Sequence, residues 1–388
     1  MSPSFGDEVR LYICGITPYD SAHLGHAFTF LTYDVLQRYL EQTGKSVKIV
    51  RNITDVDEPI YVRARQLRVH YMDLANEETA KFQNVMAKLN IKTPFAEPRA
   101  SDYIEKMAIA IQQLLDNDKA YRLKNGDIYY AVAKDPKFGK QSHLSKHLQQ
   151  AFMANRGGDP GRADKNHPFD FLLWKAIDDP ADPAQWASVV GNGRPGWHIE
   201  CTVMSSDILG VPFDLHGGGM DLIFPHHEAE SAQARGLGHP VLAHHWMHVA
   251  PMSHYGENMS KSLGNLVFVA DLLEKYDADV IRLALLGYHY RVGGEWVASR
   301  IDDAKLHMHI LQHARSLACG VDPAPYLKRF YDLLEDDFNI PEAIFVTLEL
   351  ASNSLTTENP KHDISSVLDE MLNVLGLTSL DESAKDYL

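Results

Sequence analysis

The chain has 388 residues, which favours two or three structural units, and 45% hydrophobic with 23% charged residues is ordinary for a globular protein with large cores. The formal net charge of −15 argues mildly against extended nucleic-acid contact, although a local basic groove stays compatible with it. Three widely spaced cysteines do not form a disulfide framework, no apolar run has membrane-spanning length, and residues 1–10 lack signal-peptide features. We therefore expect a cytoplasmic protein without a membrane segment.

The first elements predict a parallel α/β fold. Residues 9–16 and 46–53 are rich in Val and Ile and predict buried strands, and apolar residues at helical spacing between them predict a helix that Gly44 ends. A strand–helix–strand unit of this length implies a right-handed crossover and a parallel sheet. Ligands bind beyond the carboxyl ends of such strands, so we expect residues 14–26 and 52–57 on one ligand-binding rim.

The later elements alternate before they become uniformly helical. The pattern predicts amphipathic helices at 73–90 and 101–116, a hairpin or strand at 124–133, a mobile loop at 154–168, a strand end with a glycine turn at 212–224, and helices from about 301 onward.

A first motif, "HLGH" at 23–26, lies where the first helix should begin. A helix N-terminus offers unpaired backbone N–H groups and a positive dipole end, which favour phosphate. His23 and His26 could add donors, and Gly25 would let a ligand approach the backbone. These residues alone leave an alternative equally open, in which both histidines are surface or capping side chains.

A second motif, "MSKSLGN" at 259–265, predicts a flexible loop with one cation, Lys261, and by itself could be any solvated loop. Together the two motifs resemble the signatures of class I aminoacyl-tRNA synthetases, which bind ATP and stabilise the transition state of adenylate formation. The resemblance implies catalytic roles for His23, His26 and Lys261. Asn258 departs from the family pattern, which has a lysine at that position.

A third set contains Cys14, Cys201, His226 and Glu230. Such donors suit tetrahedral Zn²⁺, but the two cysteines lie far apart in sequence, and two buried structural cysteines are the simpler explanation from the residues alone. The set resembles the cysteinyl-tRNA synthetase superfamily, in which zinc holds the substrate thiolate. The resemblance implies one zinc ion per chain, bound by these four residues. A plain pocket separates cysteine from serine by only about 1–3 kcal/mol, whereas zinc discriminates by ligand softness.

The resemblance also implies the architecture and the substrate contacts. It implies an α/β fold: a Rossmann-like parallel-sheet catalytic domain at 1–300, with an insertion at roughly 90–190, and a C-terminal α-helical domain at 301–388. It implies L-cysteine and ATP as substrates, the latter with Mg²⁺, and a monomer. The implied substrate-binding residues are Cys14, Gly15, Thr17, Thr29, Thr54, Trp197, Gly219 and Asp221.

Within the superfamily, four features resemble the mycothiol-pathway cysteine ligases more than the synthetases. They are "CGITPYD" at 14–20, "NRGGDP" at 155–160, the segments "FDFLLWKA" and "IRLALLGYHYR", and only about 125 residues after the lysine loop. Asn155 departs from the ligase signature, which has Glu, and Glu230 and His216 resemble the synthetases instead. We expect activation of cysteine as cysteinyl-adenylate and transfer to the amine of glucosaminyl-inositol, releasing AMP and pyrophosphate. The alternatives are a cysteinyl-tRNA synthetase, a truncated paralogue that uses tRNA or another acceptor, and a catalytically silent cysteine-binding paralogue.

Overall fold

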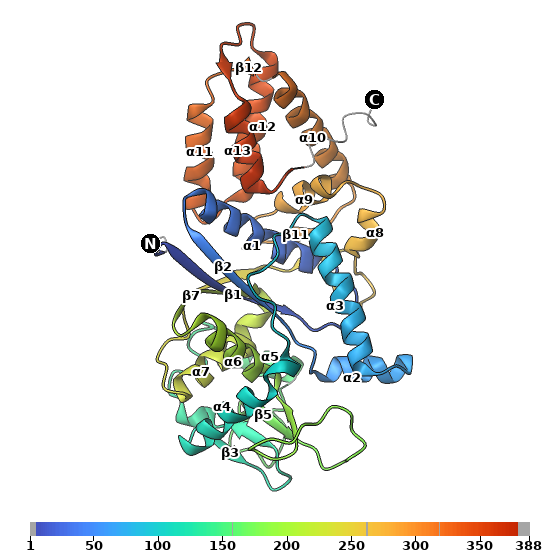
Figure 1. The fold of residues 1–388 in the computed structure, drawn as a ribbon, viewed down its shortest axis with the longest axis vertical. Helices are drawn as coiled ribbons and strands as arrows, with labels where there is room; N and C mark the ends of the chain where they lie inside the picture. Colours follow the sequence, from blue (N-terminus) through green and yellow to red (C-terminus); the bar gives the residue numbers. More distant parts are fainter. Residues whose placement is uncertain (1–4, 157, 261–262, 318, 379–388) are drawn as a thin grey trace.

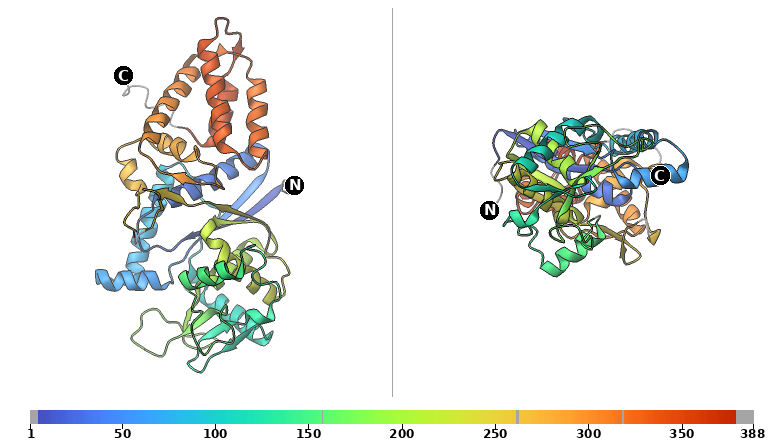
Figure 2. Two further views of the ribbon diagram at one scale, coloured as in Figure 1. Left: turned by 180° about the vertical axis from the view of Figure 1, so that it is seen from behind. Right: turned by 90° about the horizontal axis from the view of Figure 1, so that it is seen from below.

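The computed structural model describes residues 5–156, 158–260, 263–317 and 319–378. The molecule is elongated (Figure 1), with a bundle of helices at one end and a mixed α/β insertion at the other. A parallel sheet lies between them, and the view from behind in Figure 2 shows the same order.

The central sheet confirms the predicted strand–helix–strand unit. Its strands are β1 (Glu8–Ile16), β2 (Ser46–Ile53), β7 (Phe213–Gly219) and β8 (Ala243–Val249), in the order β2-β1-β7-β8. All three pairings are parallel, and helix α1 (Leu24–Gln42) connects β1 to β2. The carboxyl ends of the strands therefore share one rim, as predicted.

The two faces of the sheet belong to two hydrophobic cores, because side chains alternate along a strand. Leu11 and Ile13 of β1 belong to one core, whereas Tyr12 and Cys14 belong to the other. Helix α1 packs on the sheet in the first core and α6 (Trp197–Leu209) in the second. The alternation places the Cys14 side chain on the face that carries α6.

The predicted insertion at roughly 90–190 falls within the segment between β2 and β7. The elements of that segment are α2 (Glu58–Leu67), α3 (Tyr71–Lys88), η1 (Ala100–Tyr103), α4 (Ile104–Asp116), β3 (Ala120–Arg122), β4 (Ile128–Tyr130), η2 (Val132–Lys134), α5 (Lys146–Asn155), β5 (Phe171–Ala176), β6 (Gly193–Pro195) and α6 (Trp197–Leu209). Strands β3 to β6 form an antiparallel sheet in sequence order. The two predicted helices and the hairpin are confirmed. Helix α5 includes the first two residues of the predicted loop at 154–168. Arg162, later in that loop, donates hydrogen bonds to Asp127 and to the hydroxyl of Tyr129 at 2.9 Å each.

The elements after β7 complete the rim and the helical end. They are η3 (Met220–Leu222), η4 (Ile223–His227), α7 (Glu228–Gly236), β9 (Met252–His254), β10 (Glu257–Asn258), α8 (Val269–Leu273), α9 (Ala278–Leu286), β11 (Gly294–Glu295), α10 (Ser299–Leu317), β12 (Cys319–Gly320), α11 (Ala324–Glu335), α12 (Ile340–Thr356), β13 (His362–Asp363) and α13 (Ser365–Leu375). Helices α10 to α13 confirm the predicted helical tail. Within the described residues, every helix is too short or too polar to cross a bilayer.

Candidate functional site

Four donor side chains that are distant in sequence meet below the rim. Cys14 lies near the end of β1, Cys201 in the second turn of α6, His226 in η4 and Glu230 in the first turn of α7. The two sulfurs are 3.8 Å apart, and Cys14 Sγ lies 3.9 Å from Glu230 Oε1. One donor atom from each of the four residues lies within 4.8 Å of every other. The structure therefore brings together the whole predicted ligand set.

The cluster has the chemistry of a metal site. Two thiolates on one tetrahedral zinc, each at ~2.3 Å, are separated by about 3.8 Å, which is the separation seen here. His226 Nε2 is buried without a hydrogen-bond partner, although Glu230 Oε1 lies 3.2 Å away. Burial also lowers the pKa of His226 well below its usual value, so the ring is neutral and its lone pair can bind a cation. An unpaired nitrogen beside two thiols and a carboxylate is an arrangement that a divalent metal ion would satisfy.

A second donor set overlaps the first, and its two histidines were not predicted as ligands from the sequence. Cys14 and Glu230 also lie within 4.8 Å of donor atoms from His216 and His227. His227 Nε2 is 3.4 Å from Cys14 Sγ, and its Nδ1 is 2.7 Å from His248 Nε2. Adjacent histidines such as 226 and 227 carry no spacing signal that could rank them as ligands. Only the tertiary structure shows that both rings reach the cluster.

Two histidines outside the predicted ligand set contact its members: His198, and His216, which also belongs to the second donor set. His198 Nδ1 lies 2.8 Å from His226 Nδ1, and His216 Nε2 lies 2.8 Å from Glu230 Oε2. The ring of Trp197 stacks on His226 with centroids 4.1 Å apart. Such outer contacts fix the orientation of a ligand and raise its basicity.

Removal of either outer histidine should weaken metal binding. We expect His198→Ala and His216→Ala each to lower zinc affinity by about 10–100-fold. Each substitution removes the contact that fixes the orientation of one predicted ligand, His226 or Glu230. Competition with a chelator, followed by elemental analysis of the retained zinc, measures this. His239→Ala, at an exposed histidine, is the control and should retain zinc as the wild type does. Unchanged retention in both test variants would contradict the assigned outer contacts.

The two histidines of "HLGH" cap the N-terminus of α1. His23 Nδ1 accepts a hydrogen bond from Gly25 N at 3.1 Å, and His26 Nδ1 accepts one from His23 N at 3.3 Å. An accepting Nδ1 places the proton of a neutral ring on Nε2. Capping and a phosphate role are thus compatible, because each Nε2–H remains a donor beside the helix N-terminus. Their catalytic role stays a prediction.

The partly buried ring of His26 predicts a pH effect on stability. Burial, with a smaller effect of His23, lowers the pKa of His26 from 6.5 to about 3. His26 therefore binds a proton near pH 6.5 in the unfolded chain but not in the folded one. The free energy of unfolding falls as the pH drops below 6.5. Between pH 7 and pH 5 the wild type should lose up to about 2 kcal/mol relative to His26→Gln. Urea unfolding of both proteins at the two pH values measures the difference, and parallel pH dependences would contradict it.

Glycines at the rim allow strand ends to approach each other and the helix. A Cβ on Gly15 would lie 1.7 Å from Asn52 O, where β1 and β2 end. A Cβ on Gly217 would lie 2.5 Å from the hydroxyl of Tyr33, which donates to Met247 O at 2.7 Å and accepts from Gly218 N at 2.8 Å. Tyr33 of α1 thereby joins the ends of β7 and β8.

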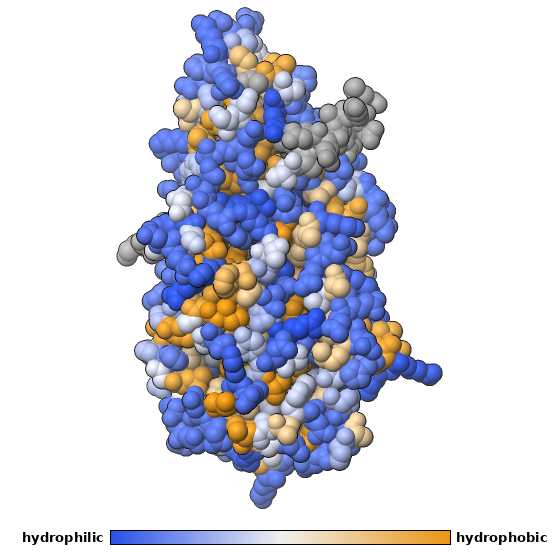
Figure 3. Space-filling view, viewed as in Figure 1, coloured by the Kyte–Doolittle hydropathy of each residue, from blue (hydrophilic) through white to orange (hydrophobic). Residues whose placement is uncertain are grey.

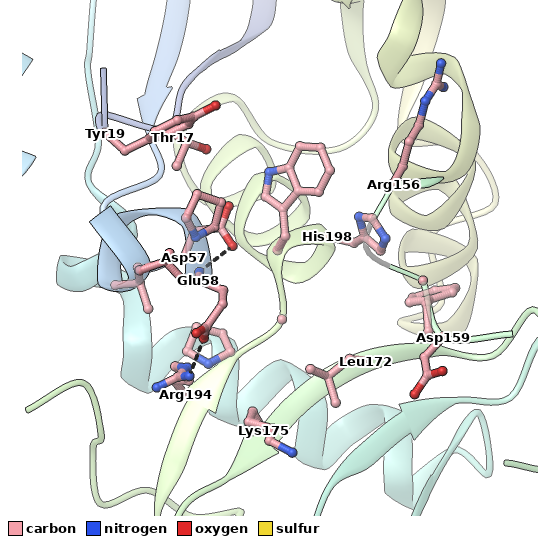
Figure 4. A pocket seen from close by; sticks show the side chains of 18 of the residues that line it. Thr17, Tyr19, Asp57, Glu58, Arg156, Asp159, Leu172, Lys175, Arg194 and His198 are labelled. Carbon is pink, nitrogen blue, oxygen red and sulfur yellow. Dashed lines mark hydrogen bonds and ion pairs between the residues drawn. The ribbon is translucent and has the colours of Figure 1, made fainter. Parts of the chain in front are cut away.

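The other predicted substrate contacts fall into two groups. Thr17 and Trp197 line a cavity of about 900 Å³ between α2, the β5–β6 hairpin and the start of α6 (Figure 4). Thr29, Thr54, Gly219 and Asp221 are not among its lining residues. Thr54 is buried and accepts from Asn52 Nδ2 at 2.9 Å, and Thr29 Oγ1 donates to Gly25 O at 3.0 Å. The substrate roles of all these residues stay predictions.

The second motif is anchored by Asn265. Its Oδ1 accepts from Ser260 N at 2.9 Å, and its Nδ2 donates to His254 O at 3.1 Å and to Asn258 O at 3.3 Å. Asn258 itself ends β10, which pairs with β9. Lys261, the predicted catalytic cation, lies outside the described residues.

Three comparisons place the chain among known proteins. Residues 1–306 match the family model "tRNA synthetases class I (C) catalytic domain". The chain is 42% identical over 352 residues to an L-cysteine:1D-myo-inositol 2-amino-2-deoxy-alpha-D-glucopyranoside ligase of Nocardiopsis dassonvillei, covering 90% of this chain and 86% of that one. It is 40% identical over 389 residues to a cysteine–tRNA ligase of Azotobacter vinelandii, covering 98% and 83%. Its fold is similar to Mycobacterium tuberculosis methionyl-tRNA synthetase in complex with methionyl-adenylate, with a TM-score of 0.69, 14% identity and coverage of 95% and 88%.

Proposed function

The chain belongs to the class I (C) tRNA synthetase family, and from that premise we propose that this ATP-dependent cysteine ligase transfers cysteine to the amine of glucosaminyl-inositol. Cysteine as the substrate amino acid is supported by one observation, the buried cluster of Cys14, Cys201, His226 and Glu230. Two sulfur donors favour zinc over hard cations. When bound there, zinc would supply a Lewis acid that takes a thiolate and rejects the serine hydroxyl.

The residues around the rim support the first chemical step. The carboxylate of cysteine attacks the α-phosphorus of ATP, which forms cysteinyl-adenylate and releases pyrophosphate. Negative charge builds on phosphate oxygens in that transition state. The free Nε2–H groups of His23 and His26, together with the N-terminus of α1, are donors suited to those oxygens.

The second step is attack by a neutral amine. The amine attacks the activated carbonyl carbon, the new C–N bond forms, the bond to the phosphate breaks to release AMP, and the nitrogen loses one proton to solvent. Some relatives of this chain are named as ligases whose acceptor is an amino sugar, and others as ligases whose acceptor is tRNA.

The charge of the helical end favours the small acceptor. Residues 301–388 contain 16 acidic and 6 basic side chains, so this region carries −10 of the formal −15. Figure 3 shows a largely hydrophilic surface over these helices. Binding of a tRNA backbone relies on clustered Lys and Arg, which this region lacks. The similarity to cysteine–tRNA ligases at 39–40% identity keeps tRNA as the second candidate.

Two assays in sequence test the proposal. Purified protein should exchange labelled pyrophosphate into ATP with cysteine and not with serine. Glucosaminyl-inositol and cysteine tRNA are then offered in parallel with ATP and labelled cysteine, and only the amino sugar should become cysteinylated. Transfer to tRNA alone would overturn the choice of acceptor. Absence of pyrophosphate exchange by zinc-loaded protein would instead support a silent cysteine-binding paralogue.

A further inference from the structure

The cavity beside the metal cluster is larger than cysteine itself requires. Its volume of about 900 Å³ lies at the upper end of small-molecule sites, whereas cysteine is a small ligand. Trp197 and His198 line it and connect it to the cluster, because Trp197 stacks on His226 and His198 bonds to the same ring. A second substrate bound in this cavity would therefore lie next to the predicted cysteine site.

The charged groups of the cavity walls are mostly committed to protein partners. Arg194 Nη2 donates to Glu58 Oε2 at 2.8 Å, and Lys175 Nζ donates to the buried Asp127 at 3.1 Å. Arg156 donates to the backbone carbonyls of Asp221 and Phe224. Cations held in this way are fixed donors for hydroxyl groups, and they are poorly placed to gather phosphates.

Two carboxylates of the cavity form no direct ion pair among the described residues, although the charge of Arg194 acts on Asp57 and that of Asp159 on Lys165. Asp57 accepts from Glu58 N at 2.8 Å and from the hydroxyl of Thr17, and Asp159 makes no ion pair in the part of the chain that the structure describes. Burial raises the pKa of Asp57 to about 6, so it is charged at pH 7 to 8. In Figure 4 the two lie on opposite sides of the cavity, with Lys175 and Leu172 between them. A carboxylate without a direct ion pair can accept hydrogen bonds from the ammonium group of a ligand.

Aromatic side chains complete the walls. Tyr19, Tyr129, Phe171 and Trp197 all line the cavity, and β5 contributes Leu172. Flat apolar faces combined with fixed donors and acceptors suit a ring compound that bears many hydroxyl groups. The walls thus combine sites for hydroxyl groups, ring faces and one positive charge.

We propose that this cavity binds the cysteine acceptor, a polyhydroxylated ring compound with an amino group, and that Lys175 and Asp159 contact it. The inference rests on the proposed function, since it assigns the place where the acceptor of that reaction lies. It predicts that side chains remote from the metal cluster determine acceptor affinity without affecting cysteine activation.

Two variants with matched controls test the site. We expect Lys175→Met and Asp159→Asn each to raise the KM for glucosaminyl-inositol about tenfold or more, which corresponds to one lost hydrogen bond to a charged group. Pyrophosphate exchange with cysteine should stay within about twofold of wild type, because neither residue is among the predicted ATP, cysteine or metal contacts. Asp127 keeps Arg162 when Lys175 is replaced, so the fold should persist, and the thermal unfolding midpoint checks this. Lys124→Met and Asp178→Asn, at exposed positions of the insertion outside the cavity, should leave both readouts unchanged.

The outcomes separate this inference from the proposed function. If wild-type protein uses the amino sugar and both cavity variants retain its KM within twofold, the cavity assignment is overturned while the function stands. If wild-type protein exchanges pyrophosphate but transfers cysteine to tRNA alone, both the acceptor and its assigned cavity are overturned. Selective loss of acceptor affinity in the two variants, with intact exchange and intact folding, supports the site.

Discussion

Replacement of Cys201 by serine should lower kcat/KM for cysteine in pyrophosphate exchange by more than a hundredfold. The substitution keeps the size of a side chain that is 1% exposed, so packing in α6 changes little. It removes one of the two sulfurs that lie 3.8 Å apart, and a neutral hydroxyl is a poor zinc ligand. Loss of a direct ligand should cost more affinity than the 10–100-fold typical of outer contacts. Zinc content by elemental analysis should fall in parallel.

The third cysteine supplies the control for this prediction. Cys319 lies in β12 at the helical end of the molecule and is absent from both donor sets found among the described residues. Cys319→Ser should therefore keep both zinc and activity. If Cys201→Ser retains exchange within threefold of wild type, the metal cluster does not select the substrate.

Loss of Arg282 should destabilise the protein by about 3 kcal/mol, because the buried Asp34 keeps only Arg38 as a cationic partner and two buried carbonyl groups lose their donor. Arg282 of α9 is fully buried, and its Nη2 lies 2.6 Å from the equally buried Asp34 of α1. The same guanidinium donates to Leu89 O and Leu375 O, each at 2.8 Å. It therefore joins α1, the end of α3 and the end of α13 at one point. Urea unfolding of Arg282→Met measures the effect.

An exposed arginine gives the matched comparison. Arg329 pairs with Glu349 at 2.7 Å on the surface of the helical end, where solvent screens the charges. Arg329→Met should change the unfolding free energy by less than about 1 kcal/mol. Equal effects of the two substitutions would mean that Arg282 is not the junction described above.

Local sequence patterns were sufficient to predict strands that bury one face and helices that bury one apolar stripe. Residues 46–53 form β2 within the predicted bounds, and α1 ends at Gln42, just before Gly44. Strand β8 was missed, since its sequence "AHHWMHV" has few aliphatic residues and its half-buried imidazoles and indole look polar or mixed. Helix α2 was missed as well, because exposed Val62 and Leu67 interrupt the polar face that an amphipathic pattern requires.

The sequence by itself determined the parallel α/β core and the helical tail, because strand and helix periodicity is local. The candidate donor set of Cys14, Cys201, His226 and Glu230 came from the resemblance to the cysteinyl-tRNA synthetase superfamily, since its two cysteines lie 187 residues apart and share no spacing signal. Tertiary structure alone decided which histidines surround that set, which charges the cavity leaves unpaired, and that Arg282 meets Asp34. Those facts depend on contacts between segments up to about 250 residues apart, and no periodicity encodes such contacts.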